Sequence, residues 1–170
     1  IGQETNGPGG LFKGLRTIPV ILDIVKDMER LCPDAWLINF TNPAGMVTEA
    51  VLRHTQMRKV VGLCNGPIGI ERGIAETLNV PKEEIYVEFT GLNHMVFAKT
   101  IYHQGIDVTK KVIDIMANNV ANAVGLKNIA DLDWEPEFFR TLGMVPICYL
   151  RYSYQTSKML ADQKRAFEEE

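Results

Sequence analysis

The sequence predicts an α/β protein in which a parallel sheet is followed, along the chain, by an α+β region. Two apolar runs at 35–40 and 59–63, the second rich in β-branched residues, flank a stretch of helical periodicity at 45–56, which is the order of a βαβ unit. Such a unit implies parallel strands joined by a right-handed crossover. Two later runs, 85–90 and 95–102, are strand candidates, and a His-Gln-Gly turn links the second of them to residues 106–108, which is typical of a hairpin. We therefore expect the sheet to change from parallel to antiparallel.

The first part of the chain supplies one helix before this βαβ unit. Residues 1–10 are rich in glycine but lack dinucleotide-loop spacing, so we expect a flexible connector. Apolar residues recur at three- and four-residue steps over 11–31, which predicts a helix that Pro19 either kinks or begins. After the first strand, Asn42 suits the N-cap of the next helix and Pro43 its first turn.

The second part alternates short strands with helices. An Asn-Gly-Pro break at 65–67 ends the second strand. Gly91 is expected to turn the chain after the third strand, and Gly143 to separate two terminal helices. The predicted helices cover residues 68–78, 109–124, 135–142 and 145–167.

Composition excludes several classes of function. The chain has 170 residues, a net charge of -3 and no basic cluster, which argues against nucleic-acid binding. It contains no signal peptide and no apolar run near 18 residues, so we expect no membrane span. Three widely spaced cysteines suit a reducing cytoplasm. Because the sequence starts at Ile1 and stops within a run of glutamates, we expect a fragment of a longer protein.

Two side chains with chemical potential follow strand ends. Cys64 comes directly after the second strand, and His94 follows the third. Open α/β sheets place their chemistry at the carboxyl ends of strands. Simpler interpretations stay open, because a lone cysteine is often a small buried hydrophobe and a lone histidine a structural residue. Tyr149 lies near the start of the last predicted helix, and tyrosines on a helix usually belong to the core.

Five sequence segments occur together in one order: Gly2–Thr5, Asn39–Gly45, Gly62–Asn65, Gly91–His94 and Tyr149–Tyr152. In this order they resemble the middle of glycoside hydrolase family 4, with the bacterial 6-phospho-β-glucosidases as the most similar branch. The resemblance extends over essentially the whole sequence, and its most specific parts are Cys64-Asn65 and Asn93-His94. The Asn-Pro-Ala turn is less specific, because lactate and malate dehydrogenases share it.

The resemblance implies a division into two parts and an activity. Residues 1–64 would be the C-terminal part of an NAD-binding, Rossmann-type domain like that of the lactate/malate dehydrogenases, and residues 65–170 the N-terminal part of an α+β domain that binds substrate and metal. The full-length protein would hydrolyse 6-phospho-β-glucosides, such as cellobiose 6-phosphate, with NAD and Mn2+. This family is an exception to two-carboxylate glycoside hydrolysis. It oxidises the sugar, removes a proton, eliminates the aglycone, adds water and reduces the product.

The resemblance also implies roles for individual residues. The implied metal ligands are the Cys64 thiolate and the His94 imidazole, a soft pair that would suit zinc or iron better than manganese. Oxygens of the substrate are therefore expected to complete the metal shell. The base would be a tyrosine. Because the ordinary pKa of tyrosine is near 10, it needs a nearby cation to act as a base at neutral pH. The NAD fingerprint and most phosphate-binding arginines are expected outside this sequence. The implied residues are Cys64 and His94 as metal ligands, Asn42, Asn65 and Asn93 on the substrate, and Tyr149 as the base.

Two other functions remain open. A 2-hydroxy-acid dehydrogenase of the lactate/malate type would need a His–Asp pair, and no suitable aspartate partner for His94 is evident. A non-catalytic oligomerisation module is the third possibility. For the glycosidase we expect a phosphorylated disaccharide as substrate and a homodimer or homotetramer. The sugar epimer and the aglycone are left open.

Overall fold

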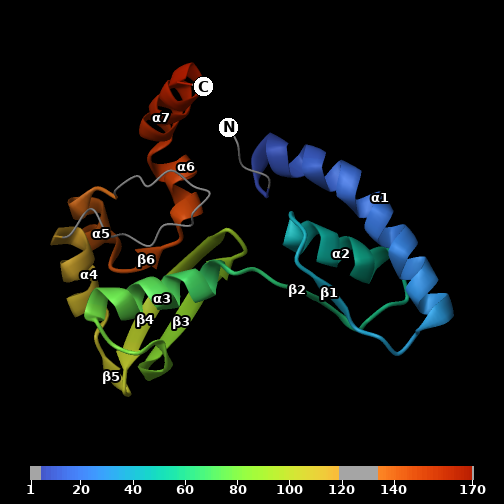
Figure 1. The fold of residues 1–170 in the computed structure, drawn as a ribbon, viewed down its shortest axis with the longest axis horizontal. Helices are drawn as coiled ribbons and strands as arrows, with labels where there is room; N and C mark the ends of the chain where they lie inside the picture. The colour runs from blue at the N-terminus through green and yellow to red at the C-terminus, as the bar shows by residue number, and fades with distance from the viewer. Residues whose placement is uncertain (1–4, 119–133, 170) are drawn as a thin grey trace. The chain divides into compact units, whose positions relative to one another are not determined.

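The computed structural model describes residues 5–118 and 134–169, and the chain divides into two units, Ile1–Cys64 (unit 1) and Asn65–Glu170 (unit 2). Figure 1 shows the elements of each unit. The start of the Gly2–Thr5 segment and the end of the helix predicted over 109–124 lie outside the described residues.

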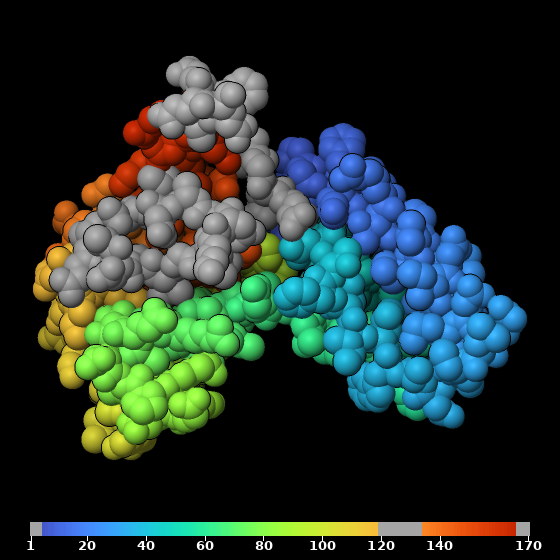
Figure 2. Space-filling view, viewed as in Figure 1, coloured from blue at the N-terminus to red at the C-terminus, as the bar shows by residue number. Residues whose placement is uncertain are grey.

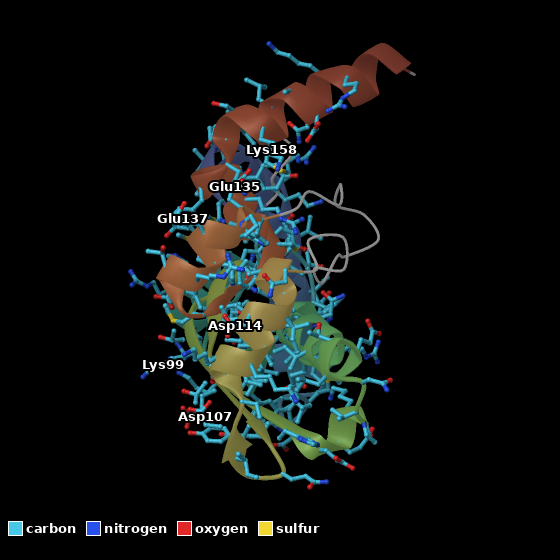
Figure 3. The ribbon with its side chains drawn as sticks, turned by 90° about the vertical axis from the view of Figure 1, so that its left-hand side faces the viewer. Lys99, Asp107, Asp114, Glu135, Glu137 and Lys158 are labelled. Atoms are coloured by element: carbon cyan, nitrogen blue, oxygen red, sulfur yellow. The ribbon has the colours of Figure 1, made fainter. Side chains whose placement is uncertain are left out.

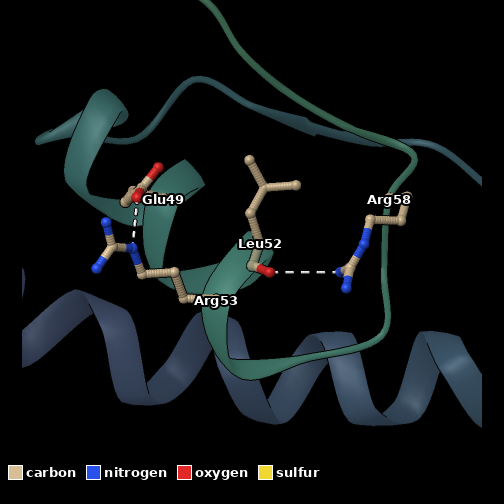
Figure 4. Close-up of polar contacts among 4 residues, drawn as sticks. All are labelled: Glu49, Leu52, Arg53 and Arg58. Carbon is tan, nitrogen blue, oxygen red and sulfur yellow. Dashed lines mark hydrogen bonds and ion pairs between the residues drawn. The ribbon is translucent and has the colours of Figure 1, made fainter.

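Unit 1 contains the predicted βαβ unit. Its strands pair in parallel, with Leu37 opposite Val60 and Asn39 opposite Gly62, so this prediction is confirmed. Arg58 donates a hydrogen bond to the Leu52 carbonyl (Figure 4). It also donates to the Thr55 carbonyl, and the two bonds hold the turn that follows α2. The elements are α1 (Gly7–Leu31), β1 (Leu37–Asn39), α2 (Ala44–His54) and β2 (Val60–Gly62).

The first helix is longer than expected. The flexible connector predicted for residues 1–10 is wrong from Gly7 onward, because α1 begins there with a proline in its first turn, where the missing N–H costs nothing. Pro19 lies inside α1 and does not begin it. Gly14 permits close packing on α2, since a Cβ there would lie 2.7 Å from the Met46 sulfur. The two helices accordingly pack side by side (Figure 2).

Described residues cover one face of the sheet in unit 1 and leave the other face exposed. Val25, Val51 and Met57 form the small core with inward-facing strand residues such as Leu37. The strands were expected to be buried, and for the outer face this expectation is wrong. Apolar side chains on that face are largely exposed in this chain, since no described element covers it: Trp36, Ile38, Phe40, Val61 and Leu63.

Unit 2 is built on an antiparallel sheet, as predicted. β3 pairs with β4 along its whole length, and β4 also pairs with β5 and β6. Helix α3 packs on the β3–β4 pair (Figure 1). The elements are α3 (Gly66–Leu78), η1 (Lys82–Glu84), β3 (Ile85–Leu92), β4 (Met95–His103), β5 (Ile106–Asp107), α4 (Thr109–Asn118), α5 (Pro136–Leu142), β6 (Val145–Pro146), η3 (Cys148–Leu150), α6 (Arg151–Tyr154) and α7 (Thr156–Glu169).

The single helix predicted over 145–167 is wrong. Residues Val145–Pro146 pair with β4, and a one-turn 3-10 helix and a short α-helix precede α7. The physical reason is Pro146, which cannot donate in a helix but tolerates a sheet edge. Near the start of α7, Lys158 forms an ion pair of 3.5 Å with Glu135, which precedes α5 (Figure 3). Among the described helices, none has the length and apolar character needed to cross a membrane.

Candidate active site

Unit 1 brings two of the predicted site residues to one edge of its sheet. Because β1 and β2 are parallel, their carboxyl ends lie together, and the Leu63 N–H extends the pairing by donating to the Asn39 carbonyl at 2.9 Å. Asn42 and Cys64 follow at this edge. Both side chains are half-buried, so Cys64 is not simply a buried hydrophobe.

A buried asparagine holds the turn that carries Asn42. Asn39 is 4% exposed, and its side chain donates to the Thr41 carbonyl at 3.2 Å while accepting from the Thr41 N–H at 3.1 Å. The Asn42–Pro43 peptide bond is cis, and Pro43 occupies the N-cap position of α2, so the N-cap role expected for Asn42 is wrong. We did not predict the role of Asn39, although an asparagine ending an apolar strand is a recognisable signal.

In unit 2, His94, the second of the two predicted metal ligands, lies in the tight turn between β3 and β4. Leu92 pairs with Met95, so Asn93 and His94 form the turn itself. Gly91 was expected to make this turn, which is wrong, because it pairs with Val96 inside the hairpin. His94 is 2% exposed and has φ of 61°, a left-handed conformation that is uncommon outside glycine.

His94 and Tyr149 meet face to face. Their ring centroids are 3.9 Å apart and the ring planes differ by 2°, so the rings are stacked. Tyr149 belongs to η3, far along the chain from the hairpin turn. The fold therefore unites the residue predicted to hold the metal with the residue predicted to act as base.

The two remaining asparagines differ in their surroundings. The side-chain oxygen of Asn93 is buried and has no hydrogen-bond partner among the described residues. Buried polar atoms are normally satisfied, so this oxygen is suited to accept a hydrogen bond from a ligand. Asn65 is exposed at the N-cap of α3, and its side chain makes no capping hydrogen bond. Its amide therefore remains available to a bound molecule.

The donor set for a metal is small. Within residues 5–118 and 134–169, no group of three or more His, Cys, Asp or Glu side chains gathers as a metal site would require. A metal held by only two side chains of this chain would therefore have to take its other ligands elsewhere. A two-donor site of this kind leaves open positions for substrate oxygens, which is what Lewis-acid chemistry needs.

Comparison with known proteins gives a consistent family. Residues 1–80 match the model of the family 4 glycosyl hydrolases, and residues 89–170 match the model of the family 4 glycosyl hydrolase C-terminal domain. The Bacillus subtilis (strain 168) protein named "Probable 6-phospho-beta-glucosidase" is 55% identical over all of this chain, which covers 38% of that protein. The 6-phospho-beta-glucosidase of Escherichia coli (strain K12) is 50% identical over 95% of this chain, which covers 36% of that protein.

Solved structures agree. The 6-phospho-beta glucosidase of Thermotoga maritima, solved with manganese, NAD+ and glucose-6-phosphate, aligns with a TM-score of 0.77 and 34% identity, over 95% of this chain and 38% of that one. A 6-phospho-alpha-glucosidase from gut microorganisms, solved with NAD and Mn2+, gives a TM-score of 0.79 and 26% identity over 89% of this chain and 37% of that one. The chain thus spans somewhat over a third of the length of these relatives.

Proposed function

Because this chain belongs to family 4 of the glycosyl hydrolases, we propose that the full-length protein hydrolyses 6-phospho-β-glucosides, such as cellobiose 6-phosphate, with NAD and Mn2+. The observation that carries the proposal is the stack of Tyr149 on His94, since it joins the proposed base to a proposed metal ligand. The relatives named for 6-phospho-β-glucoside hydrolysis, and the bound groups of the Thermotoga structure, support the substrate and the cofactors.

We assign complementary roles to the two units. Unit 1 is the C-terminal part of an NAD-binding, Rossmann-type domain, and unit 2 is the N-terminal part of a domain that binds substrate and metal. The parallel pairing in unit 1 and the antiparallel sheet in unit 2 support this division. The bound groups would supply a hydride acceptor and a Lewis acid, and the residues of this chain hold, orient and deprotonate the sugar.

Cys64 and His94 are proposed to hold the metal. Each is fixed by local structure, Cys64 by the end of β2 and His94 by the β3–β4 turn. A thiolate and an imidazole leave room for sugar oxygens, so metal affinity should rise when the sugar phosphate is present.

Tyr149 is proposed to remove the proton next to the oxidised sugar carbon. Its ring is held flat against His94, and a base must be held within hydrogen-bond reach of the proton it removes. Asn42, Asn65 and Asn93 are proposed to hydrogen-bond the substrate. An amide at position 65 cannot protonate a leaving group, which is consistent with the β-glucoside branch of the family.

The test uses the full-length protein. We expect cellobiose 6-phosphate cleavage to stop when NAD is removed or the metal is chelated, and to return when both are restored. Tyr149→Phe should lower kcat by about 100-fold or more, as loss of a general base does. Tyr152→Phe, which removes a hydroxyl three residues away, should have little effect. Cleavage that survives chelation and NAD removal would contradict the proposal, and net NADH formation on a hydroxy acid would favour a dehydrogenase instead.

We also propose that the full-length protein is a cytoplasmic homodimer or homotetramer. The exposed apolar side chains of α1, including Phe12, Leu15 and Val20, support an interface between subunits. Light scattering on the full-length protein should give the mass of a dimer or a tetramer.

A further inference from the structure

Arg151 is an unusual residue to find buried in unit 2. Its side chain is 1% exposed, and it is the largest of the fully buried side chains among the described residues. A guanidinium stays charged at any physiological pH, and burying a charge is costly unless its surroundings compensate. The residues proposed above to bind the substrate, to hold the metal or to act as base do not include Arg151.

The guanidinium lies on an aromatic platform. The Arg151 Cζ atom is 5.4 Å from the centre of the Trp134 ring, within the range of a cation–π interaction. Trp134 is 5% exposed and stacks on Phe138 at 5.3 Å, with Phe139 edge-on at 6.3 Å. Trp134 is therefore packed against other aromatic rings as well as against Arg151, and this packing fixes the position of the guanidinium.

Arg151 lies two positions after Tyr149, the proposed base, along the chain. The η3 turn that carries Tyr149 continues directly into α6, which begins at Arg151, and the Arg151 N–H bonds back to the Cys148 and Tyr149 carbonyls. At the other end of α6, the Gln155 N–H donates to the Arg151 carbonyl at 2.8 Å. The position of Arg151 therefore constrains the direction from which the Tyr149 ring approaches His94.

We propose that Arg151 and Trp134 are positioning residues for the reaction: their cation–π contact anchors the η3–α6 turn and so keeps Tyr149 stacked on His94. This inference rests on the proposed function for its catalytic meaning, because Tyr149 must be the base. Arg151 and Trp134 act through Tyr149 and are not proposed to touch the sugar.

The test compares four single substitutions in the full-length protein. Arg151→Met keeps an unbranched apolar stem and removes the charged guanidinium, and Arg151→Lys keeps the charge and removes the planar group. Trp134→Leu removes the platform, and Trp134→Phe keeps a smaller ring face. Tyr152→Phe, in the same α6 helix, is the matched control.

Misplacing a catalytic group by about 1 Å can cost about 100-fold in rate. We therefore expect Arg151→Met and Trp134→Leu to lower kcat by about 10- to 100-fold with KM for cellobiose 6-phosphate little changed. The kinetic isotope effect of deuterium at the sugar carbon that Tyr149 is proposed to deprotonate should increase, because proton removal becomes slower. Trp134→Phe should restore part of the rate that Trp134→Leu loses.

A second readout is independent of turnover. Hydrogen–deuterium exchange of the peptide 147–155 in the full-length protein should become several-fold faster in Arg151→Met and Trp134→Leu, and stay unchanged in Tyr152→Phe. If Trp134→Leu does not fold, the Arg151→Met and Trp134→Phe results decide.

Wild-type kcat in Arg151→Met would overturn the positioning role, and so would a lower kcat without faster exchange, since the charge would then act directly. Failure of the proposed function is distinguishable: in that case Tyr149→Phe itself would remain active, whatever Arg151→Met does.

Discussion

The two units treat similar apolar strands in different ways. Among the described residues of unit 1, the buried cluster contains only three side chains, and Ile38 at the centre of β1 is 62% exposed. Among the described residues of unit 2, sixteen buried side chains form one cluster, and Ile101 in β4 is fully buried. The proposed site residues of unit 2 are therefore supported by a larger core than those of unit 1. The difference shows that an apolar strand sequence indicates that a face of the sheet will be buried, but it does not indicate which segment will bury it.

The largest effect is expected at the hairpin that carries His94. Gly91 has φ of 113°, and a Cβ there would lie 2.2 Å from the Met95 carbonyl oxygen. Gly91→Ala should therefore destabilise unit 2 by at least about 4 kcal/mol, combining backbone strain with a clash that only backbone movement relieves. Chemical denaturation of the 170-residue chain measures this.

Gly105 is the control for Gly91. It lies in the turn before β5 with φ of 81°, and an added Cβ there would meet nothing within 4 Å. Gly105→Ala should cost only about 1 to 2 kcal/mol, the ordinary price of a left-handed alanine. Equal losses in the two variants would show that the close approach at Gly91 does not matter.

A matched pair of isoleucines tests the difference in burial directly. Ile101→Ala should cost about 2 to 5 kcal/mol, because it leaves a cavity in the core of unit 2. Ile38→Ala should change the stability of this chain by less than about 0.5 kcal/mol, as exposed positions usually do. Denaturant titrations of both variants give the two values, and similar losses would mean that β1 is covered after all.

Asn39 offers a smaller effect on unit 1. Asn39→Ala removes both hydrogen bonds to the Thr41 backbone and should cost about 1 to 3 kcal/mol, because the two Thr41 groups lose their partner. Asn39→Asp keeps an acceptor for the Thr41 N–H but places a buried carboxylate against the Thr41 carbonyl oxygen, so near neutral pH it should be at least as destabilising as alanine. An Asn39→Ala variant as stable as wild type would remove Asn39 from the account of the turn.

The smallest effect concerns two exposed aspartates, one in each unit. A hydrogen bond and the charge of Lys59 hold the pKa of Asp34 below its ordinary value of 3.8, and hydrogen bonds from Thr109 do the same to the pKa of Asp107. In both cases the folded pKa is depressed, so the stabilising contribution is present above pH 3.8 and disappears as the pH falls through the folded pKa.

Salt should separate these two aspartates. About 1 M NaCl screens the Lys59–Asp34 pair, so the pKa of Asp34 should move up toward 3.8, whereas the pKa of Asp107, which depends on neutral donors, should move less. Carboxyl NMR titration at low and high salt measures both values. Equal movement of the two would contradict these assigned causes.

Much of the fold followed from local pattern. The βαβ unit and the β3–β4–β5 meander were predictable because strand periodicity and turn residues are local properties. Pro146 in an edge strand and the short η3 turn were missed, because pairing with β4 depends on a distant segment. The same limit applies to the site: the resemblance selected His94 and Tyr149, but only the fold shows their rings in contact.

The central claim is that Cys64 and His94 bind one Mn2+ ion, and metal binding measures it most directly. Calorimetry on the full-length protein with glucose 6-phosphate should show that Cys64→Ser and His94→Gly, the latter compatible with the left-handed backbone, each weaken Mn2+ binding by about 100-fold or more. The double variant should be little weaker than either single one, because residues that share an ion are not additive. Wild-type affinity in either single variant, or losses that simply add, would contradict the claim.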